Sequence, residues 1–201
     1  MIEQGSKEWL LERCGYVTAS RLKDVLAKGQ GKTRESYMRR IIAERLTLTP
    51  APSFTNSAME WGTRNEPLAR MRYELGTDLV VRETGFTKHP TIKWVGGSPD
   101  GLTDIGGVEF KCPESTTHLD WLESGKLPAE HAAQVQGLMW VHDSEVWDFV
   151  SFDPRFTDEY LQYFCVRVKR DDDYIANLEK EVVRFLDEVS ERINFIGRLK
   201  K

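Results

Sequence analysis

The fold is decided by residues 98 to 113, which read SPDGLTDIGGVEFKCP. Residues 108–112 carry β-forming apolar side chains and end at Pro113, which cannot continue a strand ladder. Residues 104–107 have the Asp and Gly composition of a tight connection between strands. The stretch therefore predicts a hairpin whose second strand spans 108–112.

Three charged side chains fall on one face of this predicted hairpin. Because strand side chains alternate, Glu109 and Lys111 share a face while Phe110 points to the other. With residues 104–107 as the loop, Asp100 pairs with Lys111 and joins the same face. A slip of one residue would destroy the grouping. The predicted register places two carboxylates and an amine within about 5 to 8 Å of one another.

This grouping suits the hydrolysis of phosphodiesters. Two adjacent carboxylates repel each other unless a proton or a cation lies between them, and oxygen ligands suit Mg²⁺ or Mn²⁺. The Phe110 carbonyl can add an oxygen. Lys111 could stabilise developing negative charge or, with a lowered pKa, deprotonate a water. The alternative is a solvated strand with a weak ion pair between Glu109 and Lys111.

Composition limits the classes of protein that fit. The 201 residues are 40% hydrophobic and 30% charged, which predicts one domain with an ample core. No segment approaches 18 uninterrupted apolar residues, and the N-terminus lacks a signal-peptide pattern. The cysteines Cys14, Cys112 and Cys165 form no CxxC pair, which argues against a disulfide framework or a zinc ribbon. We therefore expect a cytoplasmic protein with no membrane segment.

The net charge of −4 is an objection to a nucleic-acid partner, because DNA binding depends on neutralising phosphates. Between Arg21 and Arg45, however, eight basic residues, among them Lys28, stand against three acidic ones. This segment indicates either a DNA-binding face or two amphipathic helices with solvated basic faces.

The pattern of elements along the chain predicts an α/β fold with a central mixed β-sheet flanked by helices. Helices are expected at 6–13, 20–28, 34–46, 57–75, 115–124, 129–141 and 171–201, and strands at 79–86, 93–96, 108–112, 145–152 and 160–168. We expect one domain with a helical part at about 1–76, a sheet core at about 77–170 and a C-terminal helix at about 171–201. The helices between strands 108–112 and 145–152 permit a parallel pair.

Two polar residues outside the hairpin are further candidates. Glu66 precedes Pro67 in the helix 57–75, which Ser57 and Glu60 open with the spacing of a capping box, and a proline there bends the helix. Gln134 shares a helix face with Leu138, so its amide can face a polar group. Either residue could instead be structural, as an exposed glutamate or as a glutamine bound to backbone.

The segment from Pro99 to Lys111 resembles the motif Pro-Asp, spacer, Asp or Glu, any residue, Lys of the restriction-endonuclease-like nuclease superfamily. Seven blocks in the same order resemble the phage lambda-type alkaline exonuclease family, also called YqaJ-like viral recombinase. These blocks are residues 9–15, 17–20, 61–66, 98–102, 109–113, 133–141 and 153–155. The resemblance implies a restriction-endonuclease-like core.

The same resemblance implies an activity and an assembly. Family members degrade one strand of linear double-stranded DNA from a 5′ end and leave a 3′ single-stranded overhang for recombination by strand annealing. It implies Mg²⁺, which Mn²⁺ can replace, with two ions in each active site. It also implies a homotrimer ring threaded by DNA, a phage single-strand annealing protein as partner, and the host cytoplasm as location.

The resemblance also assigns roles to residues at two places, the catalytic site and the site that holds the DNA end. The catalytic site comes first. Asp100, Glu109 and the Phe110 carbonyl would bind metal. Glu66, Lys111 and Gln134 would complete the catalytic site.

The second place is the site that holds the DNA end. Arg13 and Ser20, with Ser98, would hold the terminal 5′ phosphate, an anion suited to a guanidinium and hydroxyls. Met59 stands where the family has an apolar residue that parts the strands, although an aliphatic residue at a helix start can equally serve packing.

Two other classes of function stay open. One is a structure- or sequence-specific endonuclease of the same superfamily, and the other is a non-catalytic DNA-binding recombination scaffold. A cysteine hydrolase that uses Cys112 with His118 or His131 is disfavoured, because neighbouring carboxylates oppose a thiolate.

Overall fold

The computed structural model describes residues 2, 4–27, 32–52 and 56–199. Its α-helices are α1 (Lys7–Glu12), α2 (Leu22–Leu26), α3 (Lys32–Thr47), α4 (Ser57–Thr77), α5 (Ser115–Ser124), α6 (Ala129–His142) and α7 (Asp172–Arg198), with 3-10 turns η1 (Ala19–Arg21) and η2 (Glu159–Leu161). Its strands are β1 (Val17–Thr18), β2 (Thr87–Lys88), β3 (Val95–Gly97), β4 (Gly101–Leu102), β5 (Gly107–Lys111), β6 (Val146–Phe152) and β7 (Tyr163–Lys169).

The strands form two sheets. The smaller has the order β1-β3-β2, and the larger has the order β4-β5-β6-β7. Within the larger sheet β5 and β6 are parallel, while the two outer pairs are antiparallel. A parallel pair needs a crossover, and α5 and α6 supply it. The predicted mixed sheet and the predicted parallel pair are both confirmed.

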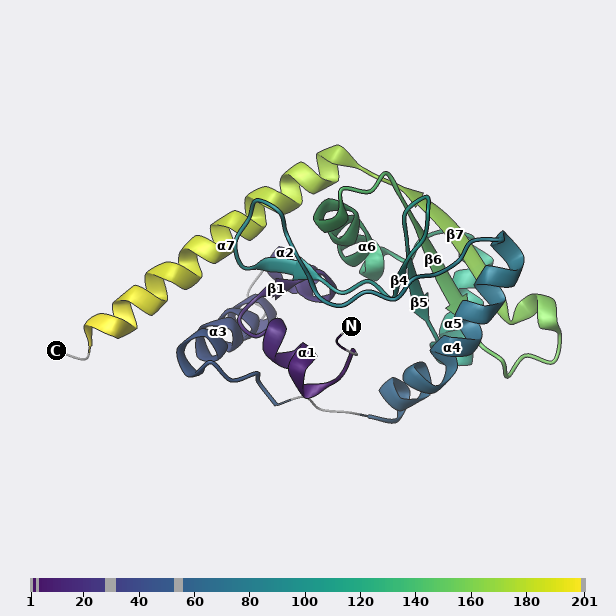
Figure 1. Cartoon of the computed structure of the whole chain (residues 1–201), viewed down its shortest axis with the longest axis horizontal. Coiled ribbons are helices and arrows are strands. Elements are labelled where there is room, and N and C mark those ends of the chain that lie inside the picture. Colours follow the sequence, from purple (N-terminus) through teal and green to yellow (C-terminus); the bar gives the residue numbers. More distant parts are fainter. Residues whose placement is uncertain (1, 3, 28–31, 53–55, 200–201) are drawn as a thin grey trace.

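Helices cover both faces of the larger sheet (Figure 1). On one face, buried side chains of β5 and β6 pack against Ala69 and Tyr73 of α4. On the other, Trp147 and Phe149 of β6 join a larger core with α6 and α7. Because Glu109 pairs with Phe149 in register, Glu109 faces the α6 side of the sheet while Phe110 faces α4.

The hairpin register differs from the predicted one by two residues. Gly101 pairs with Val108 and Leu102 with Gly107, so the connection is 103–106, closed by the Thr103 N–H donating to the Gly106 carbonyl over 2.7 Å. Gly107 belongs to the strand, where it pairs with Leu102 and Trp147, and the indole of Trp147 fills the space where a side chain would stand. The predicted register was wrong, but a shift of two residues keeps every side chain on its face.

Several predicted boundaries were also wrong. No strand forms at 79–86. Arg82 makes only an isolated antiparallel β-bridge with Leu102, and the Val81 N–H donates to the Glu74 carboxylate instead of to a neighbouring strand. Residues 159–161 form η2, so the last strand begins at Tyr163.

The helix boundaries differ for local reasons. Asn56, not Ser57, caps α4, because its side chain accepts the Met59 N–H over 2.9 Å. The helix continues to Thr77 and ends at Asp78, which adopts a left-handed conformation with φ 58°. The predicted helix 20–28 divides into η1 and α2, and Lys28 lies outside the described residues.

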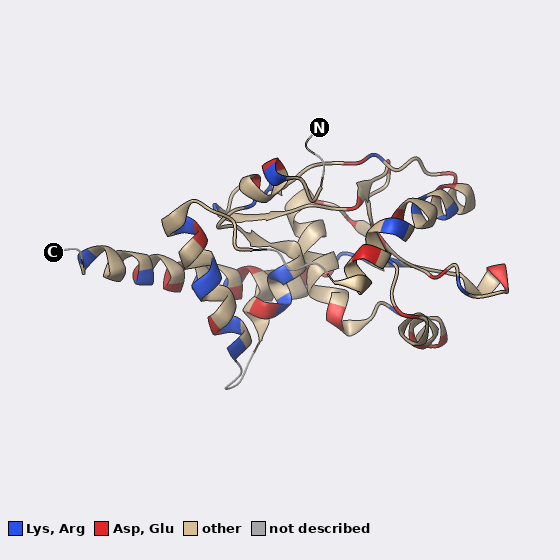
Figure 2. Ribbon diagram, turned by 90° about the horizontal axis from the view of Figure 1, so that it is seen from below, with Lys and Arg blue, Asp and Glu red and all other residues tan. Residues whose placement is uncertain are grey.

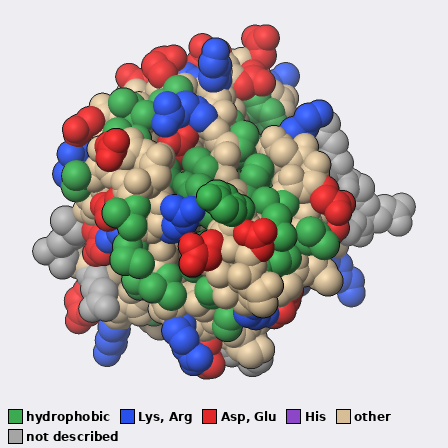
Figure 3. All heavy atoms as spheres, turned by 90° about the vertical axis from the view of Figure 1, so that its right-hand side faces the viewer, with side chains coloured by type: hydrophobic (Ala, Val, Ile, Leu, Met, Phe, Trp, Pro, Cys, Tyr) green, Lys and Arg blue, Asp and Glu red, His purple; other side chains and the backbone are tan. Residues whose placement is uncertain are grey.

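Charges of both signs are interspersed along most helices (Figure 2). Part of the basic segment 21–45 is neutralised: Arg34 makes two 2.8 Å bonds to Glu188 of α7, and Arg39 pairs with Glu35 on its own helix. Hydrophobic side chains also reach the surface on the side where α4 lies (Figure 3), and Leu68, Met71 and Leu75 of α4 are among the exposed apolar residues. No described helix is long and apolar enough to cross a membrane.

Replacing Gly107 by alanine should lower the free energy of unfolding by about 1 to 3 kcal/mol, because the added methyl collides with the fully buried Trp147 ring. Urea unfolding followed by circular dichroism measures this loss. Gly76→Ala is the matched control: it lies in α4 with open space around it and should gain up to about 1 kcal/mol. Equal effects of the two substitutions would contradict the placement of Gly107 against Trp147.

Candidate active site

The centre of the site is the edge where β4 and β5 meet. Glu109 projects from β5 and is only 1% exposed. Asp100 precedes β4, and its Oδ2 accepts the Phe110 N–H over 2.7 Å. This bond fixes the Asp100 carboxylate beside β5. Because the N–H and C=O of one strand residue leave on the same side, the Phe110 carbonyl also points toward the Asp100 side.

Glu109 has one satisfied and one unsatisfied oxygen. Its Oε1 accepts hydrogen bonds from Lys111 Nζ and from Gln134 Nε2 on α6. Its Oε2 is buried and has no hydrogen-bond partner among the described residues. A buried carboxylate oxygen without a donor is costly, so this atom is free to bind a ligand.

Helix α4 brings a third carboxylate to the site. Burial and the neighbouring Asp100 raise the pKa of Glu66 to about 7. Burial and Asp100 likewise raise the pKa of Glu109 to about 8, and burial raises the pKa of Asp100. The pKa of all three carboxyl groups is therefore raised, as expected when like charges lie close together and are partly or wholly buried.

Lys111 is the counter-charge of this cluster. Burial lowers its pKa, but the carboxylates of Glu109 and Asp100 outweigh burial and raise the pKa above its ordinary value. Lys111 is therefore a cation at neutral pH. Of the two roles expected for it, the structure favours charge stabilisation over proton abstraction.

Cavities flank the carboxylates. One of about 220 Å³ is lined by Glu66, Asp100 and Arg70, and another of about 530 Å³ by Glu66, Lys111 and His131. Glu66 lines both cavities, so both open onto the same carboxyl group.

A separate cavity of about 230 Å³ brings together Arg13, Ser20 and Met59. The Arg13 guanidinium lies 4.0 Å from the centroid of the Trp9 ring, and Trp9 Nε1 donates to Ser98 Oγ over 3.0 Å. Ser98 is thus linked to this cavity through Trp9. We call the cavity the arginine pocket. Met59 also lines the cavity of about 530 Å³ beside Lys111, so it lies between the two sites.

Some residues at these sites were not predicted. Arg21 and Arg40 line the arginine pocket, and Arg70 lies beside Glu66 and Asp100. Arg70 is four residues after Glu66 on one helix, a spacing that could have indicated it. Arg21 and Arg40 stood in the basic segment, but no sequence signal showed which of its members face Arg13.

The structure also opposes a cysteine hydrolase. Burial, followed by Glu66, raises the pKa of Cys112 to about 12, which leaves the thiol protonated. His118 is fully buried, with its ring nitrogens 2.6 Å from Ser151 Oγ and 2.9 Å from the Leu161 carbonyl. Burial lowers the pKa of His131 to about 4. His118 is held by these two bonds, and His131 with its lowered pKa is a weak base, so neither histidine favours activation of the thiol.

Solved structures share this fold. The alkaline exonuclease LHK-Exo from Laribacter hongkongensis has 42% sequence identity and a TM-score of 0.90, covering 97% of this chain and 98% of that one. Its complex with dAMP gives a TM-score of 0.91. A phage-related exonuclease from Haemophilus somnus 129PT has 14% identity and a TM-score of 0.68, with 90% and 96% of the two chains covered, and shows the fold alone.

Curated proteins show similarity over shorter stretches. ExoD of Escherichia coli K12 is 34% identical over 71 residues, which are 35% of this chain and 79% of ExoD. R354 of Acanthamoeba polyphaga mimivirus is 26% identical over 162 residues, and the match spans 74% of this chain but only 29% of R354.

The family comparison agrees with six of the seven blocks of sequence, and the seventh, 153–155, lies beyond the matched residues. Residues 8–145 match the family model of the YqaJ-like viral recombinase domain. That match covers more than half of the 201 residues and includes the carboxylates, Lys111, Gln134 and the arginine pocket. The chain belongs to the YqaJ-like viral recombinase family.

Proposed function

We propose that this protein is a Mg²⁺-dependent exonuclease that degrades one strand of linear duplex DNA from its 5′ end and leaves a 3′ overhang for recombination by strand annealing. The observation that carries the proposal is the grouping of Asp100, Glu109 and Lys111, with a buried Glu109 oxygen that lacks a partner among the described residues. Membership of the family and the similarity to LHK-Exo, an alkaline exonuclease, support nuclease activity.

The residues present fit a hard divalent cation. In the described part of the chain no group of three or more His, Cys, Asp or Glu side chains is arranged to hold a metal alone. The proposed ligands are therefore the Asp100 and Glu109 carboxylates and the Phe110 carbonyl, an all-oxygen set that leaves positions for water and suits Mg²⁺ or Mn²⁺. Bound there, the metal would polarise the phosphate and activate water. Glu66 lies beside these ligands, where its ionised carboxylate would add to the negative charge that attracts the cation.

The other residues act on charge, protons and orientation. The Lys111 ammonium balances negative charge on the reacting phosphate. Gln134 holds Glu109 by the bond to Oε1, which fixes the direction of Oε2. Glu66, with its pKa raised to about 7, can accept a proton from the attacking water at neutral to alkaline pH.

The arginine pocket supports an end-dependent enzyme over an internal one. Arg13 and Ser20 offer a guanidinium and a hydroxyl to an anion, as a terminal phosphate requires, and Ser98 accepts a hydrogen bond from Trp9, which lines the pocket. Met59, 53% exposed, stands between this pocket and the carboxylates, where it can part the two strands. An endonuclease would not need a pocket for a chain end.

Assembly and partners rest on the family resemblance. We propose a homotrimer ring around DNA, a phage single-strand annealing protein as partner, and action in the host cytoplasm. A non-catalytic scaffold is the remaining alternative, and cleavage assays separate it from a nuclease.

Asp100→Asn and Lys111→Ala should each lower nucleotide release by at least about 100-fold, because metal and charge stabilisation contribute several kcal/mol and about 1.4 kcal/mol is tenfold. The assay digests linear duplex labelled at each terminus, with Mg²⁺ or with chelator. Closed circular duplex should stay intact. Asp104→Asn is the matched control on the same hairpin, where the acid is 80% exposed and paired with Arg82, and should keep normal turnover. Near-normal turnover of Asp100→Asn or Lys111→Ala would refute the site.

Arg13→Ala should bring the ratio of rates on 5′-phosphorylated and 5′-hydroxyl ends close to one, because the guanidinium that holds the phosphate is lost. Initial rates on two duplexes that differ only in this group measure the ratio. Arg39→Ala is the control, since that side chain is 77% exposed in the basic segment and does not line the pocket. A preference that persists in Arg13→Ala removes Arg13 from this role.

Mn²⁺ binding to the metal-free protein should strengthen between pH 6 and pH 9. Glu66 and Glu109 hold protons below their pKa values of about 7 and about 8, and a cation must displace those protons. Above these values both groups are ionised and the affinity should level off. Isothermal titration calorimetry across this range measures the affinity, with Glu109→Gln as the variant that loses binding. Affinity independent of pH would show that these carboxyls are not at the metal.

A further inference from the structure

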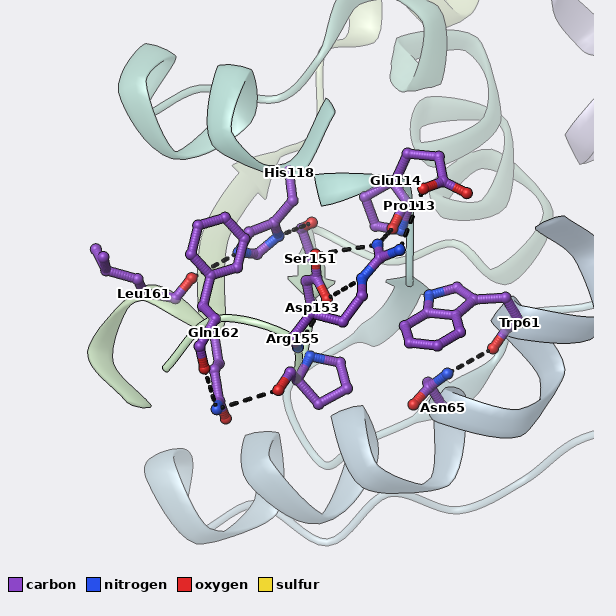
Figure 4. Close-up of polar contacts among 12 residues, drawn as sticks. Trp61, Asn65, Pro113, Glu114, His118, Ser151, Asp153, Arg155, Leu161 and Gln162 are labelled. Atoms are coloured by element: carbon purple, nitrogen blue, oxygen red, sulfur yellow. Dashed lines mark hydrogen bonds and ion pairs between the residues drawn. The ribbon is translucent and has the colours of Figure 1, made fainter. Parts of the chain in front are cut away.

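A buried polar cluster lies at the end of β6, outside the proposed reaction (Figure 4). Its centre is Asp153, which is 0% exposed. Arg155 binds both oxygens of this carboxylate: its Nε lies 2.8 Å from Oδ1 and its Nη2 lies 3.1 Å from Oδ2. Asp153-Pro154-Arg155 is one of the blocks that resemble the family, but it lies beyond the residues that match the family model, and the proposed mechanism uses none of its side chains.

The turn that carries Arg155 is itself held in place. Gln162 Nε2 donates to the Phe156 carbonyl over 2.7 Å, and the Asp153 N–H donates to the Gln162 carbonyl over 2.9 Å. Arg155 therefore projects from a fixed base.

The same guanidinium reaches two other segments. Nη2 donates to the Pro113 carbonyl over 2.8 Å, and Nη1 donates to Glu114 Oε2 over 3.1 Å. On another side, the guanidinium carbon lies 4.3 Å from the centroid of the Trp61 ring. Figure 4 shows Arg155 between Asp153 and Pro113, with Trp61 alongside. One side chain thus joins β6, the residues after β5, and α4.

These contacts border the proposed active site. Pro113 is two residues after Lys111, and Trp61 is five residues before Glu66 on the same helix. Lys111, Pro113 and Glu66 all line the cavity of about 530 Å³. Arg155 contacts α4 by stacking its guanidinium on the face of the Trp61 ring. It makes no hydrogen bond there, because Trp61 Nε1 is buried without a hydrogen-bond partner among the described residues.

We propose that Arg155 is a positioning residue that fixes the end of β5, and with it Lys111, relative to α4 and Glu66. The inference rests on the proposed function, because it concerns the geometry of that site. Only a planar fork of donors can bind Asp153, reach the Pro113 carbonyl and stack on Trp61 together. A lysine carries its charge on one nitrogen, so it would keep the ion pair with Asp153 but would not also reach the Pro113 carbonyl and stack on Trp61.

Kinetics of Arg155→Lys separate positioning from stability. The variant keeps a cation beside Asp153, so its melting temperature should stay near that of wild type. Its kcat should fall about 10- to 100-fold, because small misplacements of reacting groups cost this much. KM for duplex ends should stay within twofold, since the arginine pocket holds the end. If Arg155 only neutralised Asp153, lysine would restore kcat in full, and this result would overturn the proposal.

Matched variants test which contacts matter. Trp61→Phe keeps a ring under the guanidinium and should keep most of kcat, whereas Trp61→Leu should lower it. Arg167→Ala is the control: Arg167 makes two bonds, of 2.9 and 2.8 Å, to the buried Asp148 and has no bond to Pro113. The Arg167→Ala variant should be less stable than wild type but keep its kcat. Equal losses of kcat in Arg167→Ala and Arg155→Ala would overturn the proposal.

A readout independent of activity uses hydrogen exchange of the metal-free protein. Arg155→Ala should speed exchange in peptides that cover 57–66 and 109–115, because these segments lose the one side chain that contacts both of them. Arg167→Ala should leave both segments at wild-type rates. Unchanged exchange in Arg155→Ala overturns the inference. Absence of nucleotide release by the wild-type protein refutes instead the proposed function, so the two failures are distinguishable.

Discussion

The structure depends on one electrostatic constraint, the gathering of three carboxyl groups around one half-buried ammonium. Asp100, Glu109 and Glu66 have pKa values raised by burial, and the last two also by the repulsion of Asp100. Lys111 supplies one positive charge and Gln134 a neutral donor, while the Arg70 guanidinium beside Glu66 and Asp100 is paired with Glu83. This leaves the cluster short of positive charge whenever all the carboxyls ionise, so a divalent cation would stabilise the folded protein as well as serve its chemistry.

The fold holds this cluster from both faces of one sheet. Alternation along β5 sends Glu109 toward α6, where Gln134 meets it, and Phe110 toward α4. Helix α4 packs on that second face through Ala69 and Tyr73 and delivers Glu66 to the edge of the strand. The reactive groups therefore come from elements that are fixed by core packing, which is how a protein keeps like charges close together.

Local rules predicted the part of the site that lies on one strand. Glu109 and Lys111 had to share a face in any register, and Asp100 stayed with them because the true register differs from the predicted one by two residues. The placement of Gly107 in the strand goes with Trp147, whose ring takes up the space of a side chain there, and these two residues are far apart in sequence and meet only in the folded sheet. Arg21 and Arg40 were missed for the same reason, since only tertiary packing turns them toward Arg13.

The net charge of −4 and a DNA substrate are compatible because the positive charge is local. Arg34 and Arg39 of the basic segment are bound to Glu188 and Glu35. Arg13, by contrast, lies half-buried over Trp9 and lines a small pocket. Charges on an exposed surface are screened beyond about 8 Å at physiological salt, whereas a partly buried guanidinium is screened less. The terminal-phosphate site that we propose in this pocket therefore needs no wide basic face, and the acidic remainder would disfavour contact with duplex away from the end.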